Sequence, residues 1–218
     1  MKHIRAAIFD LDGTLLNTLD NITAAVNHTL TVYGMPPRTP AEVRAFVGNG
    51  VVNLISRAVP EGTDDATTAR VLRDFRGYYA EHTLDLTAPY DGILHALARL
   101  KAAGIRMAVV SNKPQVSVQA LCRHFFADFI DVAYGDSPDR PRKPAPDGTF
   151  SALERLGVPV AQAVFIGDGD ADVETANNAG LRCIGVTWGF RDPDELRAAG
   201  AAVLLDSPTE MADYLLNL

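Results

Sequence analysis

The sequence predicts a doubly wound, Rossmann-like α/β core with an all-helical segment inserted after the first strand. Two observations carry this prediction. Short, continuously apolar runs alternate with helical patterns over residues 88–218, which is typical of a parallel sheet covered by helices on both faces. Residues 18–87 show helical periodicity and no evident strand. We therefore expect residues 1–16 and 88–218 to form the core and residues 17–87 to form a helical cap.

Each expected strand is a short run of apolar residues. Because these runs do not alternate with polar residues, both faces of each strand are expected to be buried, as in a parallel sheet. The runs lie at residues 6–9, 107–110, 130–133, 163–166, 183–186 and 202–205.

Two helical stripes are evident in the inserted segment. Apolar residues recur at three- and four-residue steps over residues 22–33, with Thr18 as a candidate N-cap and Gly34 as the stop. A second stripe covers residues 71–82 and includes Tyr79, which we expect in the core of the cap. A proline-rich turn separates the two stripes.

The core segment carries helix signals of its own. A stripe over residues 93–100 ends at Gly104, just before an expected strand. The last helix has a complete start signal, with Ser207 as N-cap, Pro208 at the first helical position and Glu210 at the third.

The composition is that of a globular protein, with 47% hydrophobic and 22% charged residues in a chain of 218. The two cysteines, Cys122 and Cys183, have apolar neighbours, which indicates buried thiols rather than a disulfide framework. The formal net charge of −7 disfavours nucleic-acid and anionic-membrane partners. We expect no secretion signal, because acidic residues follow the charged first residues before any apolar stretch, and no apolar run approaches about 20 residues. We therefore expect a cytoplasmic monomer or homodimer that binds neither nucleic acid nor membrane.

Polar residues follow three of the expected strands at their carboxyl ends, where doubly wound sheets bind ligands. Taken singly, each group has a simpler explanation as a turn or a helix N-cap, and Lys143, which lies in a loop nearby, could be a solvated surface lysine. The three groups are Asp10-Leu11-Asp12-Gly13-Thr14, Ser111-Asn112-Lys113 and Gly167-Asp168-Gly169-Asp170-Ala171-Asp172.

Taken together, these groups predict a metal-assisted phosphoryl-transfer site. Several carboxylates at one edge of a sheet repel one another unless a cation lies between them. Hard oxygen ligands suit Mg²⁺, and the absence of histidine and cysteine from the motifs disfavours zinc. A divalent ion, a lysine and hydroxyl or amide donors can stabilise the charge of a transferring phosphoryl group.

These motifs, in this order, resemble those of the haloacid dehalogenase-like superfamily of phosphohydrolases, and the resemblance spans essentially the whole chain. Within the superfamily the chain is most similar to the phosphoglycolate phosphatase group. The weaker marks of that group are Gly48-Asn49-Gly50, Tyr90-Asp91-Gly92, Ala176-Asn177-Asn178-Ala179-Gly180 and Trp188-Gly189.

The resemblance implies catalytic and metal-binding roles. Asp10 would be the nucleophile that forms an aspartyl-phosphate, and Asp12 would act as general acid and then general base. Lys143 would neutralise charge on the nucleophile and the phosphoryl group. Asp10, the main-chain carbonyl of Asp12 and Asp168 would bind Mg²⁺, with Asp172 in an outer position or bound through water.

The resemblance also implies substrate contacts. Ser111 and the main chain of Asn112 would bind phosphoryl oxygens, and Thr14 would fix the substrate-binding loop. The backbone of residues 48–50 would approach the substrate from the cap, whereas Arg44 is expected on a solvated helix face. The implied activity is Mg²⁺-dependent hydrolysis of a small phosphorylated metabolite, with 2-phosphoglycolate as the leading candidate.

The chain departs from the family pattern at three places. Asn17-Thr18 stands where many relatives have Asp-Ser, close to the expected hinge of the cap. Gly169 stands where serine or threonine is common, and Asp170 is an additional carboxylate that we expect to be a helix N-cap. None of these changes removes a residue that the implied mechanism needs.

Other activities of the same motifs stay open. A phosphosugar mutase would pass the phosphoryl group to a sugar, and a non-enzymatic phospho-receiver domain would retain it, although such a domain lacks inserted helices. A dehalogenase would need neither the metal nor Asp12. A phosphonate-cleaving hydrolase would need a lysine in the cap, and residues 17–86 contain none.

Overall fold

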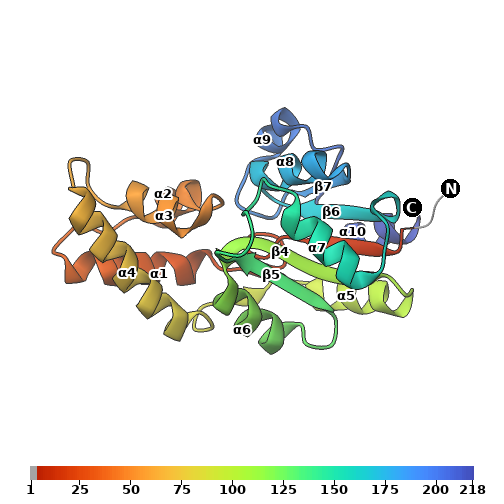
Figure 1. Ribbon diagram of the computed structural model, residues 1–218, viewed down its shortest axis with the longest axis horizontal. Helices are drawn as coiled ribbons and strands as arrows, with labels where there is room; N and C mark the ends of the chain where they lie inside the picture. Colours follow the sequence, from red (N-terminus) through yellow and green to blue (C-terminus); the bar gives the residue numbers. More distant parts are fainter. Residues whose placement is uncertain (1–3) are drawn as a thin grey trace.

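The computed structural model describes residues 4–218 and contains the predicted α/β core (Figure 1). Six strands form one sheet in the order β5-β4-β1-β6-β7-β8, and all neighbouring strands pair in parallel. The central strand β1 lies between β4 and β6. The strands are β1 (Ala6–Phe9), β4 (Arg106–Pro114), β5 (Val132–Asp136), β6 (Ala163–Gly167), β7 (Arg182–Val186) and β8 (Val203–Leu205).

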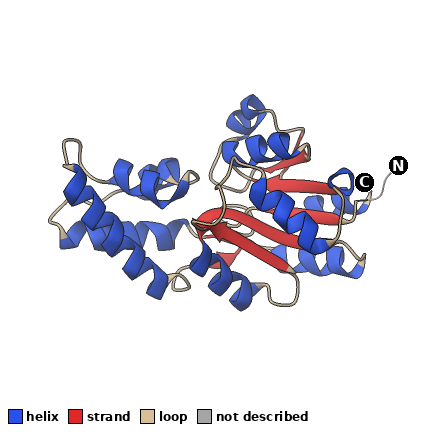
Figure 2. Cartoon of the chain, viewed as in Figure 1, coloured by secondary structure: helices blue, strands red, loops and turns tan. Residues whose placement is uncertain are grey.

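Helices cover both faces of this sheet (Figure 2). One apolar cluster joins Ala7 and Phe9 of β1 to α5 (Ile93–Ala102), α6 (Gln115–Phe125) and α10 (Pro208–Leu216). A second cluster joins the alternate residues of β1, Ala6 and Ile8, to α7 (Asp147–Leu156), α8 (Asp170–Ala179) and α9 (Pro193–Ala199). A 3₁₀ turn, Val160–Gln162, precedes β6. The doubly wound fold is thus confirmed.

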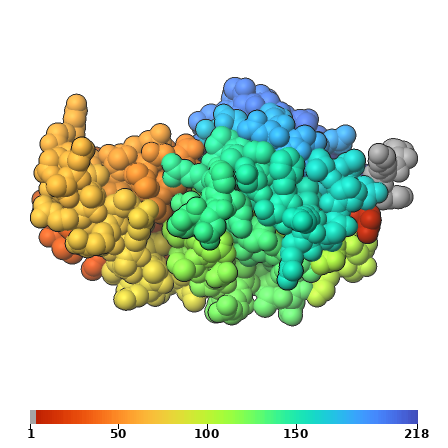
Figure 3. Space-filling view, in the orientation of Figure 1, coloured from red at the N-terminus to blue at the C-terminus, as the bar shows by residue number. Residues whose placement is uncertain are grey.

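Four helices lie between β1 and the rest of the core: α1 (Leu19–Val32), α2 (Pro40–Phe46), α3 (Gly50–Ala58) and α4 (Asp65–His82). We call α1 to α4 the helical insert. A two-stranded antiparallel ribbon, β2 (Leu16–Asn17) with β3 (Ala88–Pro89), connects it to the core. The insert has an apolar cluster of its own and forms one end of the elongated molecule (Figure 3).

The structure differs from the sequence prediction at several elements. Only two of the four insert helices were expected, because α2 and α3 have seven and nine residues and are too short to show a long apolar stripe. β4 continues through Pro114, beyond the apolar run, and its pairing with β5 is irregular between Val110 and Pro114. The polar Ser111, Asn112 and Lys113 are buried there, which apolar patterning could not indicate.

The topology places a ligand-binding crevice at β1 and β6. The chain leaves β1 towards the face covered by α5, through the insert, and leaves β6 towards the face covered by α8. Adjacent strands that send the chain to opposite faces open a crevice at their carboxyl ends. Within residues 4–218, no helix combines the length and the apolar character needed to cross a membrane.

Candidate active site

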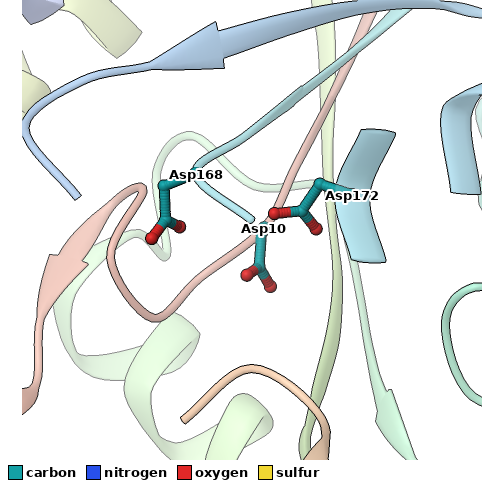
Figure 4. Close-up of side chains that lie close together, drawn as sticks. All are labelled: Asp10, Asp168 and Asp172. Carbon is teal, nitrogen blue, oxygen red and sulfur yellow. The ribbon is translucent and has the colours of Figure 1, made fainter. Parts of the chain in front are cut away.

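The acidic residues of the first and last motifs meet at the carboxyl ends of β1 and β6. Asp10 follows β1, and its N–H donates a hydrogen bond to the carbonyl of Ile166 on β6 (2.9 Å). Asp168 follows β6, and Asp172 lies in the first turn of α8. One oxygen from each carboxylate lies within 4.8 Å of the other two, and Figure 4 shows the three side chains gathered together. The pairing of β1 with β6 therefore brings residues from distant parts of the chain into one cluster.

Asp168 is buried and held by two hydrogen bonds. The Thr14 hydroxyl donates to one carboxylate oxygen (2.7 Å), and the Phe190 N–H donates to the other (2.8 Å). Gly13 and Gly189 press against this carboxylate, because a Cβ atom at either position would come within 2.3 Å of an Asp168 side-chain atom. Two glycines are thus needed to leave room for the Asp168 side chain.

Gly189→Ala is expected to displace Asp168 and to weaken Mg²⁺ binding by about 10–100-fold, the usual effect of disturbing groups that orient a metal ligand. Calorimetric titration with Mg²⁺ measures the change. Gly169→Ala is the matched control, because its backbone is extended (φ −129°) and the nearest atom to a new Cβ is 3.5 Å away. Equal Mg²⁺ affinity in Gly189→Ala and wild type would contradict the assignment of Asp168 as a ligand.

Lys143 connects the other two carboxylates. Its ammonium lies 2.8 Å from Asp10 Oδ1 and 2.6 Å from Asp172 Oδ1, and its side chain is only 3% exposed. The second oxygen of Asp172 accepts a hydrogen bond from the Gly169 N–H (2.9 Å). Burial would lower the pKa of Lys143, but Asp10 and Asp172 outweigh burial and hold that pKa above its ordinary value. Lys143 is therefore a fixed positive charge next to Asp10.

The cluster suits a divalent cation. Burial raises the pKa of Asp168 and of Asp172, and repulsion from Asp10 adds to the rise at both positions. Three carboxylates with a single lysine among them leave excess negative charge in a buried space, and a divalent ion would offset it. The donor atoms are hard oxygens, which fits Mg²⁺ better than zinc.

Asp12 lies apart from this triad and forms a different ion pair. Lys113 Nζ is 2.9 Å from Asp12 Oδ1 and 3.2 Å from Oδ2. The same ammonium donates to the hydroxyl of Tyr79 on α4 (2.6 Å) and lies 4.6 Å from the centre of its ring. Tyr79 is buried in the insert, as expected, but its hydroxyl also contacts the core. From sequence, Lys113 was part of the Ser111-Asn112-Lys113 motif but was given no role, and Tyr79 was expected only in the core of the cap.

A cavity of about 50 Å³ opens beside Asp10 and Asp12, between the insert and the core. Ser111, Asn112 and Lys113 line it from β4. The Asn112 side chain donates to the carbonyls of Gly48 (3.2 Å) and Lys143 (3.1 Å), which ties the insert to the active-site loops. Its Oδ1 is buried without a hydrogen-bond partner in the part of the chain that the structure describes. This oxygen is a free acceptor next to the cavity.

The structure places the remaining candidate residues differently with respect to the cavity. Gly48 and Gly50 line the cavity, whereas Asn49 and Thr14 do not. Arg44 is paired with Asp192 at the surface (3.1 Å) instead of facing the cavity.

The expected N-cap at Asp170 is wrong by one residue. Gly169 is the N-cap of α8, because it has an extended backbone and directly precedes the first helical residue; its N–H also donates to the Asp172 side chain. Asp170 is half exposed, and its closest cation is Arg191, 3.9 Å away.

The segment after β7 makes contacts that sequence reasoning missed. Phe190 belongs to the apolar cluster of the insert although it follows β7 of the core. The Arg191 guanidinium donates to the main-chain carbonyls of Arg44 (3.1 Å) and Val47 (2.6 Å). These contacts hold the insert against the carboxyl end of the sheet, directly over Asp10 and Asp168.

Comparison with known proteins identifies similar chains over the full length. A family model described as haloacid dehalogenase-like hydrolase matches residues 7–186. A phosphoglycolate phosphatase of Rhodospirillum rubrum is 36% identical over 222 residues, covering 97% of this chain and 90% of the relative. An N-acetylmuramic acid 6-phosphate phosphatase of Pseudomonas aeruginosa is 32% identical, covering 99% and 97%. A solved structure from Lactobacillus delbrueckii, whose own assignment as a phosphoglycolate phosphatase is a prediction, has a TM-score of 0.94 at 36% identity and covers all of both chains.

Proposed function

The chain belongs to the haloacid dehalogenase-like hydrolases, and from that premise we propose that it is a Mg²⁺-dependent phosphomonoester hydrolase acting through an aspartyl-phosphate. We further propose 2-phosphoglycolate as the substrate to test first. The observation that carries the proposal is the placement of Asp10, which shares a carboxylate cluster with Asp168 and Asp172 and has the Lys143 ammonium 2.8 Å away. A nucleophile at Asp10 would have the Lys143 ammonium and a metal ion available to neutralise the phosphoryl charge.

In the proposed first step, a carboxylate oxygen of Asp10 attacks phosphorus, and the bond from phosphorus to the ester oxygen breaks. Asp12 gives a proton to the departing oxygen, which leaves as an alcohol. In the second step, Asp12 takes a proton from water, whose oxygen attacks the phosphorus of the aspartyl-phosphate. Inorganic phosphate leaves and the Asp10 carboxylate is restored, so atoms and protons balance over the cycle.

The surrounding residues hold these groups in place. Asp10, Asp168 and the main-chain carbonyl of Asp12 would hold Mg²⁺, with Asp172 directly or through water. The ion would add positive charge at the phosphoryl oxygens. Ser111 and the main chain of Asn112, in the carboxyl-terminal half of β4, would bind those oxygens, and Thr14 would keep Asp168 oriented.

We propose that residues 17–87 act as a cap over a core made of residues 1–16 and 88–218. The short ribbon of β2 and β3 is the covalent link between the two, so it is the natural hinge for opening and closing. Gly48 and Gly50 of the cap line the small cavity beside Asp12, which supports a small leaving group. The names of the relatives support a small phosphorylated metabolite, and 2-phosphoglycolate is the smallest of those they name.

A phosphate-release screen tests the proposal. The purified protein is incubated with 2-phosphoglycolate, sugar phosphates and nucleotides in Mg²⁺, and each reaction is repeated with EDTA. We expect release from 2-phosphoglycolate above the others and loss of release in EDTA. Conversion of a hexose phosphate into an isomer without free phosphate would instead identify a mutase, and a long-lived phosphoprotein without turnover would identify a receiver.

A further inference from the structure

Lys113 is the one cationic side chain that lines the cavity beside Asp12 in the described part of the chain. On the core side, the lining residues with ionisable side chains are Asp10, Asp12 and Lys113. On the insert side, the wall is apolar except for the Tyr79 hydroxyl. The apolar side chains of that wall are Ile22, Val47, Val51, Leu54 and Phe75.

Lys113 is held rigidly at the boundary between core and insert. Its side chain is 3% exposed and is fixed from one side by the Asp12 carboxylate (2.9 Å) and from the other by the Tyr79 hydroxyl (2.6 Å). The Tyr79 ring also lies 4.6 Å from the ammonium, a favourable arrangement for a buried cation. A lysine fixed in this way presents its charge at one place, which is what recognition of a specific anion requires.

Three other cations lie near the site but do not line this cavity. Lys143 and Arg191 line the pocket over the acidic cluster, on the side of Asp168. The Arg191 guanidinium is already hydrogen-bonded to main-chain carbonyls of the insert. Arg142 is exposed and lines another pocket together with Ser111, although its guanidinium lies against Gly50, where an added Cβ would be 2.9 Å from Nη1. A leaving group seated beside Asp12 therefore meets the charge of Lys113.

We propose that Lys113 is a specificity-determining residue that receives a carboxylate on the leaving group, so that the preferred substrates are phosphoesters of small 2-hydroxycarboxylates. This inference rests on the proposed function. The leaving oxygen must lie next to Asp12 to receive its proton, and Lys113 is in direct contact with Asp12. A carboxylate on the carbon that bears this oxygen would therefore lie within reach of the ammonium.

The rest of the cavity supports the same substrate class. Gly50 and Val51, the first residues of α3, line the cavity. The Asn49 side chain does not cap this helix, so the positive end of the α3 dipole faces the leaving group. The apolar side chains of the insert wall accept a methylene group, and they offer few partners to the several hydroxyl groups of a sugar, which are costly to bury unpaired.

The test compares 2-phosphoglycolate with ethyl phosphate, which has a methyl group where 2-phosphoglycolate has its carboxylate. We expect wild type to prefer 2-phosphoglycolate in kcat/KM. In Lys113→Met, which keeps the length of the side chain and removes the charge, kcat/KM for 2-phosphoglycolate should fall at least about 30-fold more than kcat/KM for ethyl phosphate. Lys113→Met also removes the ion pair with Asp12, which should lower kcat/KM for both substrates equally. The ratio of the two kcat/KM values therefore reports only recognition of the carboxylate.

Two further variants complete the test. Tyr79→Phe keeps the ring and removes the hydroxyl that holds Lys113, so it should shift the same ratio in the same direction by about 3–10-fold. This variant tests the proposal if Lys113→Met does not fold. Lys101→Met removes an exposed cation that does not line the cavity and should leave the ratio unchanged.

Several results would overturn the inference. An equal fall for both substrates in Lys113→Met would show that Lys113 acts only through Asp12. A wild type that hydrolyses ethyl phosphate as well as 2-phosphoglycolate would show that the carboxylate is not recognised, while leaving the phosphatase activity intact. Absence of phosphate release from every monoester would instead overturn the proposed function itself.

Discussion

Asp10→Asn is expected to reduce phosphate release by about 10⁴-fold or more, the scale on which loss of the nucleophile acts in hydrolases with a covalent intermediate. An amide oxygen is a poor nucleophile, and it cannot form the mixed anhydride through which the phosphoryl group passes. Steady-state phosphate release measures the loss. Acid quenching during turnover should trap a phosphorylated chain from wild type and none from the variant.

Asp170→Asn provides the matched control for this experiment. Asp170 is a carboxylate of the same crevice, but its side chain is half exposed and does not belong to the triad. This variant should retain activity within a few-fold of wild type. If Asp10→Asn kept activity at the level of Asp170→Asn, the phosphoryl group would have to pass directly to water, and the covalent mechanism would be wrong.

The core could be predicted from sequence because its signals are local. Continuous apolar runs mark strands that are buried on both faces, and a parallel sheet places the residues after each strand at one edge. Asp10 and Asp168 each come directly after such a strand, so their proximity is a consequence of the pairing of β1 with β6. The start signal at Ser207 was likewise confirmed, with its hydroxyl accepting a hydrogen bond from the Glu210 N–H (3.2 Å).

The contacts between insert and core could not be predicted, because they depend on how two separately packed parts dock. Tyr79 carries a helical core signal, and nothing near it in sequence indicates that its hydroxyl meets Lys113, 34 residues away. Arg191 reaches Val47 across 144 residues in the same way. Patterns of apolar residues predict a loop wherever polar residues follow an apolar run, so they could not indicate that β4 continues through Lys113.

Lys143→Met is expected to cost both activity and stability. Removing one partner of a buried ion pair leaves its carboxylates uncompensated, at a cost of about 3–5 kcal/mol in the free energy of unfolding. For a chain of this size, that corresponds to a fall in Tm of roughly 6–20 °C. Phosphate release should fall by about 10²–10³-fold, because a charge facing the transferring group is lost. Thermal unfolding in EDTA and steady-state assays in Mg²⁺ measure the two effects.

The destabilisation should depend on pH in a defined direction. The pKa of Asp172 is already raised by burial in the folded protein, and loss of Lys143 would raise it further. A carboxyl group with a raised pKa binds its proton more tightly in the folded state, so its contribution to stability is present at low pH and is lost as pH rises. The gap in Tm between Lys143→Met and wild type should therefore be larger at pH 7 than at pH 4.

The response to Mg²⁺ shows whether Lys143→Met is destabilised by the missing positive charge or by altered packing of the side chain. If Lys143 and a divalent ion neutralise the same carboxylates, added Mg²⁺ should raise the Tm of Lys143→Met by more than it raises that of wild type, because the ion replaces part of the missing charge. Lys101→Met, which removes an exposed lysine, should change the free energy of unfolding by less than about 0.5 kcal/mol and should respond to Mg²⁺ as wild type does. An equal Mg²⁺ response in all three proteins would mean that the ion does not bind between Asp10, Asp168 and Asp172, and the metal site would have to lie elsewhere.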